Sequence, residues 1–108
     1  MLFSKDGSVL ISYPKSLNAA SYTVPDGVVR IDAYAFASNT YLQTVSLPSG
    51  LLSIGFAAFK DCANLDTVSF RGGPSLLVIE YEAFYNCANL RIFDIPSTLT
   101  RIEEKAFA

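Results

Sequence analysis

The chain repeats itself with a period of about 23 residues, and this repeat limits its fold more than any other feature. Four segments share the pattern Ile-x-x-x-Ala-Phe, and their isoleucines, Ile31, Ile54, Ile79 and Ile102, lie 23, 25 and 23 positions apart. A unit this short has too little apolar surface to hold itself, so neighbouring copies must stack and share one core. The repeat therefore predicts a solenoid.

Each repeat contains a short segment in which apolar and polar side chains alternate. Val45 and Leu47 alternate with Thr44 and Ser46, and the same alternation returns at Val68/Phe70 and Phe93/Ile95. A period of two is typical of a strand with one buried face. The alternate residues then form two exposed columns on a sheet, flanked by Gln43, Asp66 and Arg91. One column holds Ser21, Thr44, Thr67 and Ile92, and the other holds Thr23, Ser46, Ser69 and Asp94.

The rest of each repeat predicts the structure on the opposite side of the coil. Leu51 and Ile54 indicate a second extended segment, and the small residues between Ile54 and Phe59 favour a tight helical turn. After the second copy Arg71 replaces the expected proline, and Gly72-Gly73 precede Pro74, which predicts a lengthened loop. The predicted fold class is a repeat solenoid of ~23-residue coils, mainly β with short helical turns.

The first twenty residues depart from this pattern. Asp6-Gly7 separates two apolar runs, which is a strong hairpin signal. We expect a hairpin over Leu2–Tyr13 that caps the first coil. The predicted organisation is a cap and link over residues 1–20, followed by about four coils over residues 21–108, the last of them incomplete. The apolar end left by that last coil predicts self-association.

Composition argues against several function classes. The chain has no histidine, eight Lys/Arg against ten Asp/Glu and no basic cluster, so neither acid–base catalysis nor nucleic-acid binding is supported. No apolar run reaches the ~18 residues of a membrane span. We therefore expect no enzyme activity, cofactor or metal. The carboxylates of Glu80, Glu82, Glu103 and Glu104 are interpreted as a solvated face.

Two cysteines occupy the same repeat position, with Asn39 one coil earlier. Cys62 and Cys87 predict a ladder of small buried side chains that stay reduced. A disulfide between adjacent coils is an alternative, because stacked strands lie roughly 4.8 Å apart. A zinc site has too few ligands with two cysteines alone.

Three further aromatic residues lie at or near one position in consecutive coils. Tyr34, Phe56 and Tyr81 either pack between coils or form an exposed strip for a protein or a sugar. We call these three residues the aromatic strip.

The consensus Leu-x-x-Val-x-x-Pro-x-x-Leu-x-x-Ile-x-x-x-x-Phe-x-x-Cys-x-x-Leu resembles the BspA-like class of leucine-rich repeats. Tyr22–Ala108 carry the resemblance, and Cys62-Ala-Asn-Leu65 and Cys87-Ala-Asn-Leu90 make it specific. The resemblance implies a bacterial surface or secreted protein that adheres to host matrix or cell-surface proteins, with no catalytic residues. Secretion would need a signal upstream of these residues. The alternatives are a carbohydrate-binding module and a spacer that only projects another domain.

Overall fold

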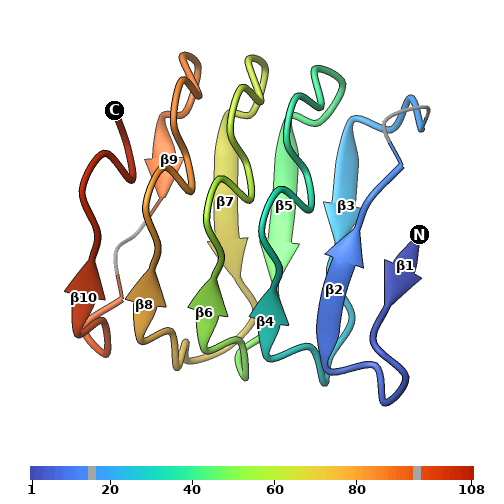
Figure 1. The fold of residues 1–108 in the computed structure, drawn as a ribbon, viewed down its shortest axis with the longest axis vertical. Helices are drawn as coiled ribbons and strands as arrows, with labels where there is room; N and C mark the ends of the chain where they lie inside the picture. Colours follow the sequence, from blue (N-terminus) through green and yellow to red (C-terminus); the bar gives the residue numbers. More distant parts are fainter. Residues whose placement is uncertain (15–16, 94–95) are drawn as a thin grey trace.

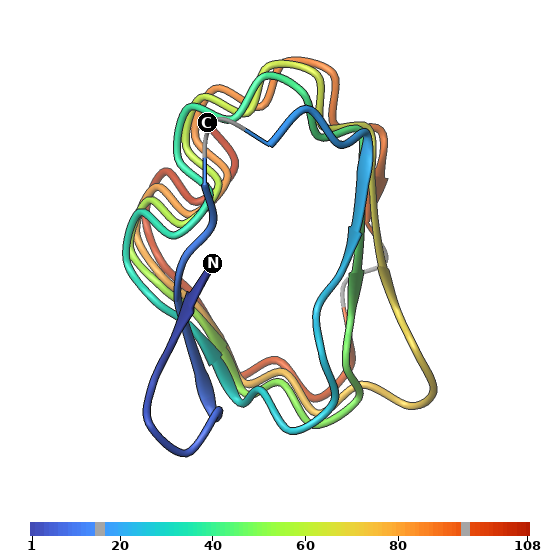
Figure 2. The same cartoon turned by 90° about the vertical axis from the view of Figure 1, so that its right-hand side faces the viewer.

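The structure is a computed structural model that describes residues 1–14, 17–93 and 96–108. Its strands form two sheets on opposite sides of a solenoid, in which each coil stacks on the one before (Figures 1 and 2). The four-stranded sheet holds β3 (Ser21–Thr23), β5 (Thr44–Leu47), β7 (Thr67–Phe70) and β9 (Ile92–Phe93). The six-stranded sheet holds β1 (Leu2–Phe3), β2 (Val9–Ser12), β4 (Arg30–Ile31), β6 (Ser53–Ile54), β8 (Val78–Ile79) and β10 (Arg101–Ile102).

The amino-terminal hairpin is part of the six-stranded sheet. β1 pairs antiparallel with β2, and β2 then pairs parallel with β4, which places Leu10 beside Ile31. The Asp6 side chain holds the turn, since one of its oxygens accepts hydrogen bonds from Ser4 and from the backbone and hydroxyl of Ser8. These bonds lower the pKa of Asp6 to about 2. The predicted hairpin is confirmed, whereas the division of the chain at residue 20 stays a prediction.

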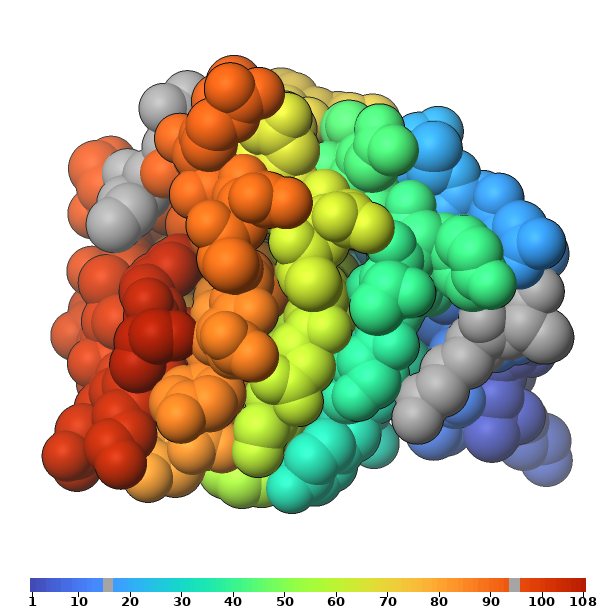
Figure 3. Space-filling view, turned by 90° about the horizontal axis from the view of Figure 1, so that it is seen from above, coloured from blue at the N-terminus to red at the C-terminus, as the bar shows by residue number. Residues whose placement is uncertain are grey.

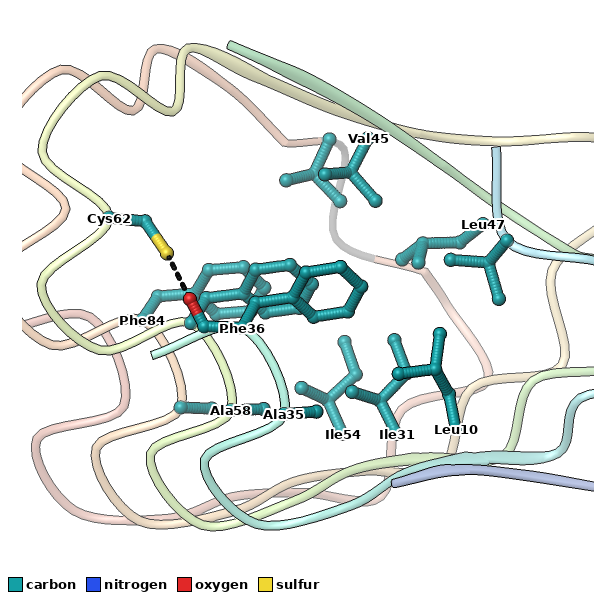
Figure 4. Packing of buried hydrophobic residues seen from close by; sticks show 14 of the residues in the cluster. Leu10, Ile31, Ala35, Phe36, Val45, Leu47, Ile54, Ala58, Cys62 and Phe84 are labelled. Atoms are coloured by element: carbon teal, nitrogen blue, oxygen red, sulfur yellow. Dashed lines mark hydrogen bonds between the residues drawn. The ribbon is translucent and has the colours of Figure 1, made fainter. Parts of the chain in front are cut away.

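The core consists of ladders of identical or similar side chains. Phe36, Phe59 and Phe84 stack face to face, with ring centroids 4.7 and 5.0 Å apart and planes within 5° (Figure 4). Phe59 and Phe84 are 0% and 1% exposed, which confirms the buried face assigned from the repeat. Ile31, Ile54 and Ile79 form a parallel ladder, and register along the sheet pairs each with its equivalent.

The segment after each isoleucine forms consecutive turns instead of the predicted helical turn. Its backbone takes positive φ at equivalent positions of successive coils, 54° at Ala57 and 56° at Glu82, for example. The Lys60 N–H bonds back to the Ala57 carbonyl within its coil, while the Phe59 N–H reaches the Ala83 carbonyl of the next coil. A helix would keep all its N–H groups within one segment. Alternating turns instead extend the hydrogen bonding between coils beyond the sheets.

The lengthened loop after β7 projects beyond the outline of the other coils (Figure 2). Arg71, at the position of the expected proline, folds back across the stack. Its guanidinium donates to the Ser46 carbonyl and hydroxyl, both at 3.1 Å, to the Val24 carbonyl and to the Asp26 carboxylate at 2.9 Å. One side chain therefore ties three consecutive coils together.

Candidate functional site

The outer face of the four-stranded sheet presents the two predicted columns of side chains. Parallel pairing aligns Ser21, Thr44, Thr67 and Ile92 in one column and Thr23, Ser46 and Ser69 in the other. Thr44 and Ser69 are exposed, and the Ile92 side chain is 52% exposed. Asp94, predicted to extend the second column, lies outside the described residues. We call this surface the sheet face.

Arg71 modifies the sheet face in a way that the sequence did not indicate. The Ser46 hydroxyl accepts a hydrogen bond from the Arg71 guanidinium, and Ser46 is half-buried as a result. The Arg71 guanidinium therefore covers part of the second column at Ser46, whereas Thr44 in the first column is open to solvent. A large partner would meet short hydroxyl groups in the first column and the Arg71–Asp26 ion pair beside the second.

A concave region of about 440 Å³ lies beside the sheet face, where the turns of three coils enter β5, β7 and β9. The Arg91 guanidinium makes a bidentate pair with Asp66, with nitrogen–oxygen distances of 3.0 and 2.8 Å. This pairing lowers the pKa of Asp66, so the carboxylate stays charged. We call this region the polar hollow; it is lined by Gln43, Asn64, Asp66, Ala88, Asn89 and Arg91.

The aromatic strip is continuous, but most of its contacts are internal. Phe56 and Tyr81 lie parallel with ring centroids 5.7 Å apart, and the Tyr34 ring lies nearly perpendicular to Phe56 with centroids 5.3 Å apart. Phe56 and Tyr81 are half-buried, while Tyr34 is 54% exposed. The rings therefore pack mainly between coils, and only Tyr34 offers a largely open side chain.

The two thiols form the predicted ladder beside the phenylalanine stack. Each donates to a backbone carbonyl of the preceding coil, Cys62 to Phe36 at 3.1 Å (Figure 4) and Cys87 to Phe59 at 3.0 Å. Both are free thiols; Cys62 is fully buried and Cys87 half-buried. Burial raises the pKa of Cys62 to about 12 and that of Cys87 to about 11. The arrangement is structural, and neither thiol is activated as a nucleophile.

We expect both thiols to resist a maleimide or disulfide reagent at pH 8 in the folded protein. A thiol with a raised pKa presents almost no thiolate at that pH, and burial of Cys62 also blocks access. Thiol counting should give two reactive groups in denaturant. Rapid labelling of Cys62 in the folded protein would contradict the buried ladder, and fewer than two groups in denaturant would indicate a disulfide.

The carboxylates predicted to be a solvated face are, in part, structural. Glu80 forms an ion pair with Arg30 at 2.8 Å and also accepts the Phe56 N–H at 3.1 Å, and its side chain is only 26% exposed. Glu103 repeats the backbone contact by accepting the Tyr81 N–H at 3.2 Å. Glu82 is 15% exposed and pairs with Lys60. Glu104 is exposed and Glu103 half-buried, so the solvated interpretation is wrong for Glu80 and Glu82.

Removing the charge of Glu80 should lower stability at neutral pH and matter less in acid. Arg30 holds the pKa of Glu80 below its usual value, so this stabilisation is present above the unfolded-state pKa and is lost as the pH falls through the folded one. Glu80→Gln should cost about 1 kcal/mol at pH 7. Urea titrations at pH 7 and pH 3 measure this, with Glu104→Gln as the exposed control. Equal losses at both pH values would contradict the ion pair.

Other kinds of site find little support in residues 1–14, 17–93 and 96–108. No group of three or more metal-ligating side chains occurs there, and no helix in that part of the chain is long and apolar enough to cross a membrane. At the carboxyl-terminal end, Leu90, Arg91, Phe93 and Phe107 line a hollow of about 230 Å³. Phe107 is 39% exposed. Self-association through this end stays a prediction.

Comparisons with known proteins agree on the type of repeat. The model of the BspA type leucine-rich repeat region, in six copies, matches residues 12–108. No curated protein matches the chain in a sequence search. Among solved structures, a leucine-rich cell surface protein from Faecalibacterium prausnitzii is 35% identical, with a TM-score of 0.87 over 98% of this chain. The pneumococcal vaccine antigen PcpA is 36% identical, with a TM-score of 0.86 over 93%.

A leucine-rich repeat protein of T. pallidum is 29% identical, with a TM-score of 0.81 over 98% of this chain. The chain spans only part of each of these proteins: 28% of the Faecalibacterium protein, 24% of PcpA and 51% of the T. pallidum protein. The similarity therefore covers a stretch of repeats and does not extend to the whole of any relative.

Proposed function

The chain belongs to the BspA-type leucine-rich repeat family, and from this membership we propose that it is a non-catalytic protein-binding module of a bacterial cell-surface protein. The sheet face is the proposed binding surface, and a host matrix or cell-surface protein is the proposed partner. The similarity to a leucine-rich cell surface protein supports the location. Fold alone does not determine function, so the proposal depends on the surface itself.

The observation that carries the proposal is the continuous parallel register of the four-stranded sheet. It aligns short hydroxyl side chains over three of its strands, β3, β5 and β7, with Thr44 beside Thr67 and Ser46 beside Ser69. Short side chains leave the sheet flat, so a large partner can approach the backbone closely. Solenoids commonly use such extended faces for binding. Ile92 is an exposed apolar side chain in the same column as Thr44 and Thr67, and its burial by a partner would add to the binding free energy.

The experiment measures binding of the protein to a panel of purified matrix proteins by surface plasmon resonance. Thr44→Arg and Thr67→Arg should each weaken binding at least tenfold, because a long charged side chain then stands in the middle of the sheet face. The matched control is Leu52→Arg, at an exposed apolar residue beside the six-stranded sheet, and it should bind as the parent does.

Two outcomes count against the proposal. Unchanged binding by a folded Thr44→Arg variant would move the site elsewhere, and the aromatic strip around Tyr34 would be the next candidate. Failure to bind any matrix protein would favour the spacer, in which the repeats only project another domain.

A further inference from the structure

The polar hollow has the volume of a small-molecule site and adjoins the sheet face without including its two columns. Its volume of about 440 Å³ lies within the usual range of ligand sites. The turn segments that contribute to it come from neighbouring coils, which lie side by side as bands in Figure 3. Its lining includes no large apolar side chain, so an aliphatic or aromatic ligand would find few partners there.

Contacts between coils hold the polar groups of the hollow in place. The Asn64 side-chain nitrogen donates to the Thr40 carbonyl at 2.7 Å, and its amide oxygen accepts a long hydrogen bond from the Asn89 side chain at 3.5 Å. Arg91 uses Nε and Nη2 to bind Asp66, so the hydrogens on Nη1 remain for a ligand. Within the described residues, the Gln43 carboxamide has no hydrogen-bond partner. The hollow therefore combines oriented groups at Asn64 and Arg91 with an unpaired carboxamide at Gln43, and part of their hydrogen-bonding capacity is unused.

The balance of charge narrows the class of ligand. Asp66 and Arg91 neutralise one another, and the carboxamides of Gln43, Asn64 and Asn89 carry no charge. A phosphate or an isolated cation would gain little from such a set. A ligand with several hydroxyl groups fits it better, because each hydroxyl both donates and accepts, as each carboxamide does.

An exposed aromatic residue, Tyr41, precedes the lining residue Gln43 by two positions. Tyr41 occupies the position equivalent to Asn64 in the preceding coil and is 46% exposed. Stacked coils are separated by roughly 4.8 Å, so Tyr41 lies one coil from Asn64, and we expect its ring to meet a ligand that extends beyond the lining of the hollow. An aromatic ring has an apolar body and a polar tip, which suits the C–H and hydroxyl groups of a sugar.

We propose that the polar hollow binds a hexose unit of a neutral glycan. Gln43, Asn64 and Arg91 hydrogen-bond its hydroxyl groups, and Tyr41 packs against its ring. This site adjoins the proposed protein-binding surface but does not include its two columns, so either proposal can fail without the other.

The test displays the protein, carrying a biotin tag at its carboxyl terminus, as a streptavidin tetramer on an array of neutral, sialylated and sulfated glycans. Tetramer display raises the avidity of a weak site by roughly 10²–10⁴. We expect retention on neutral glycans. For the best of these, titration calorimetry should show at least tenfold weaker binding by Gln43→Ala and by Asn64→Ala. Asn18→Ala, an exposed amide outside the hollow, should bind as the parent does.

The outcomes separate the alternatives. No retention on any glycan, or retention on the sialylated or sulfated glycans alone, overturns the proposal. Normal binding by Gln43→Ala together with loss in Tyr81→Ala also overturns it, because the aromatic strip is then the sugar site. The Gln43 side chain is exposed, so its variant should fold, which circular dichroism checks. Loss of glycan binding in an Asn64→Ala variant that still binds its matrix protein distinguishes this site from the sheet face.

Discussion

Phe59→Ala should lower the free energy of unfolding by about 3–5 kcal/mol. Phe59 is fully buried and stacks on a ring on each side, Phe36 at 4.7 Å and Phe84 at 5.0 Å. Truncation therefore removes apolar contacts with two neighbouring coils and leaves a cavity between them. Coils of a solenoid contact only their neighbours, so the loss falls at an interface for which the rest of the chain offers no substitute. Urea unfolding followed by circular dichroism measures the effect.

Phe107→Ala is the matched control, because Phe107 occupies the same repeat position but packs on a ring of the stack on one side only. It contacts Phe84 at 5.1 Å and is 39% exposed. Its truncation should cost about 1 kcal/mol. If Phe59→Ala cost less than about 1 kcal/mol, or no more than Phe107→Ala, the continuous phenylalanine stack would not be the main source of cohesion between coils.

The sequence could predict the ladders because the period itself specifies them. Residues 23 or 25 positions apart become neighbours in space, so the pairing of Thr44 with Thr67 and the stacking of Phe36 on Phe59 follow from the alignment alone. The columns of the sheet face and the cysteine ladder are the same inference applied to other positions. Contacts between residues one repeat apart are therefore predictable from the sequence.

Features that break the repeat could not be predicted in this way. Arg30 forms an ion pair with Glu80, fifty residues further along the chain. It therefore connects two coils that are separated by a third one. Arg71 was visible only as a missing proline, yet it determines how much of Ser46 is open. Turn conformation was hidden for another reason: positive φ occurs at Tyr34, Ala57, Glu82 and Lys105, residue types that do not favour it.

Gly55 lies beside the Arg30 side chain of the Arg30–Glu80 ion pair, and substitution of this glycine should have the second large effect on stability. Gly55→Ala should destabilise the protein by about 2–3 kcal/mol, as overpacking a filled site does. A Cβ at this position would lie 2.8 Å from the Ile31 carbonyl oxygen, 2.9 Å from the Ala33 nitrogen and 2.9 Å from the Arg30 guanidinium. Two of these three neighbours are backbone atoms of the preceding coil, which cannot move aside without opening the stack.

Gly50→Ala is the control, because a Cβ there meets nothing within 4 Å. It should be neutral or raise stability by up to about 1 kcal/mol, through a smaller entropy of the unfolded chain. The Gly55→Ala and Arg30→Ala double variant then shows which neighbour clashes with the added Cβ. If the backbone contacts dominate, removing the guanidinium leaves the loss in place. Full recovery in the double variant would show that only the arginine requires a glycine there, and a loss in Gly55→Ala no larger than in Gly50→Ala would contradict the close packing of these coils.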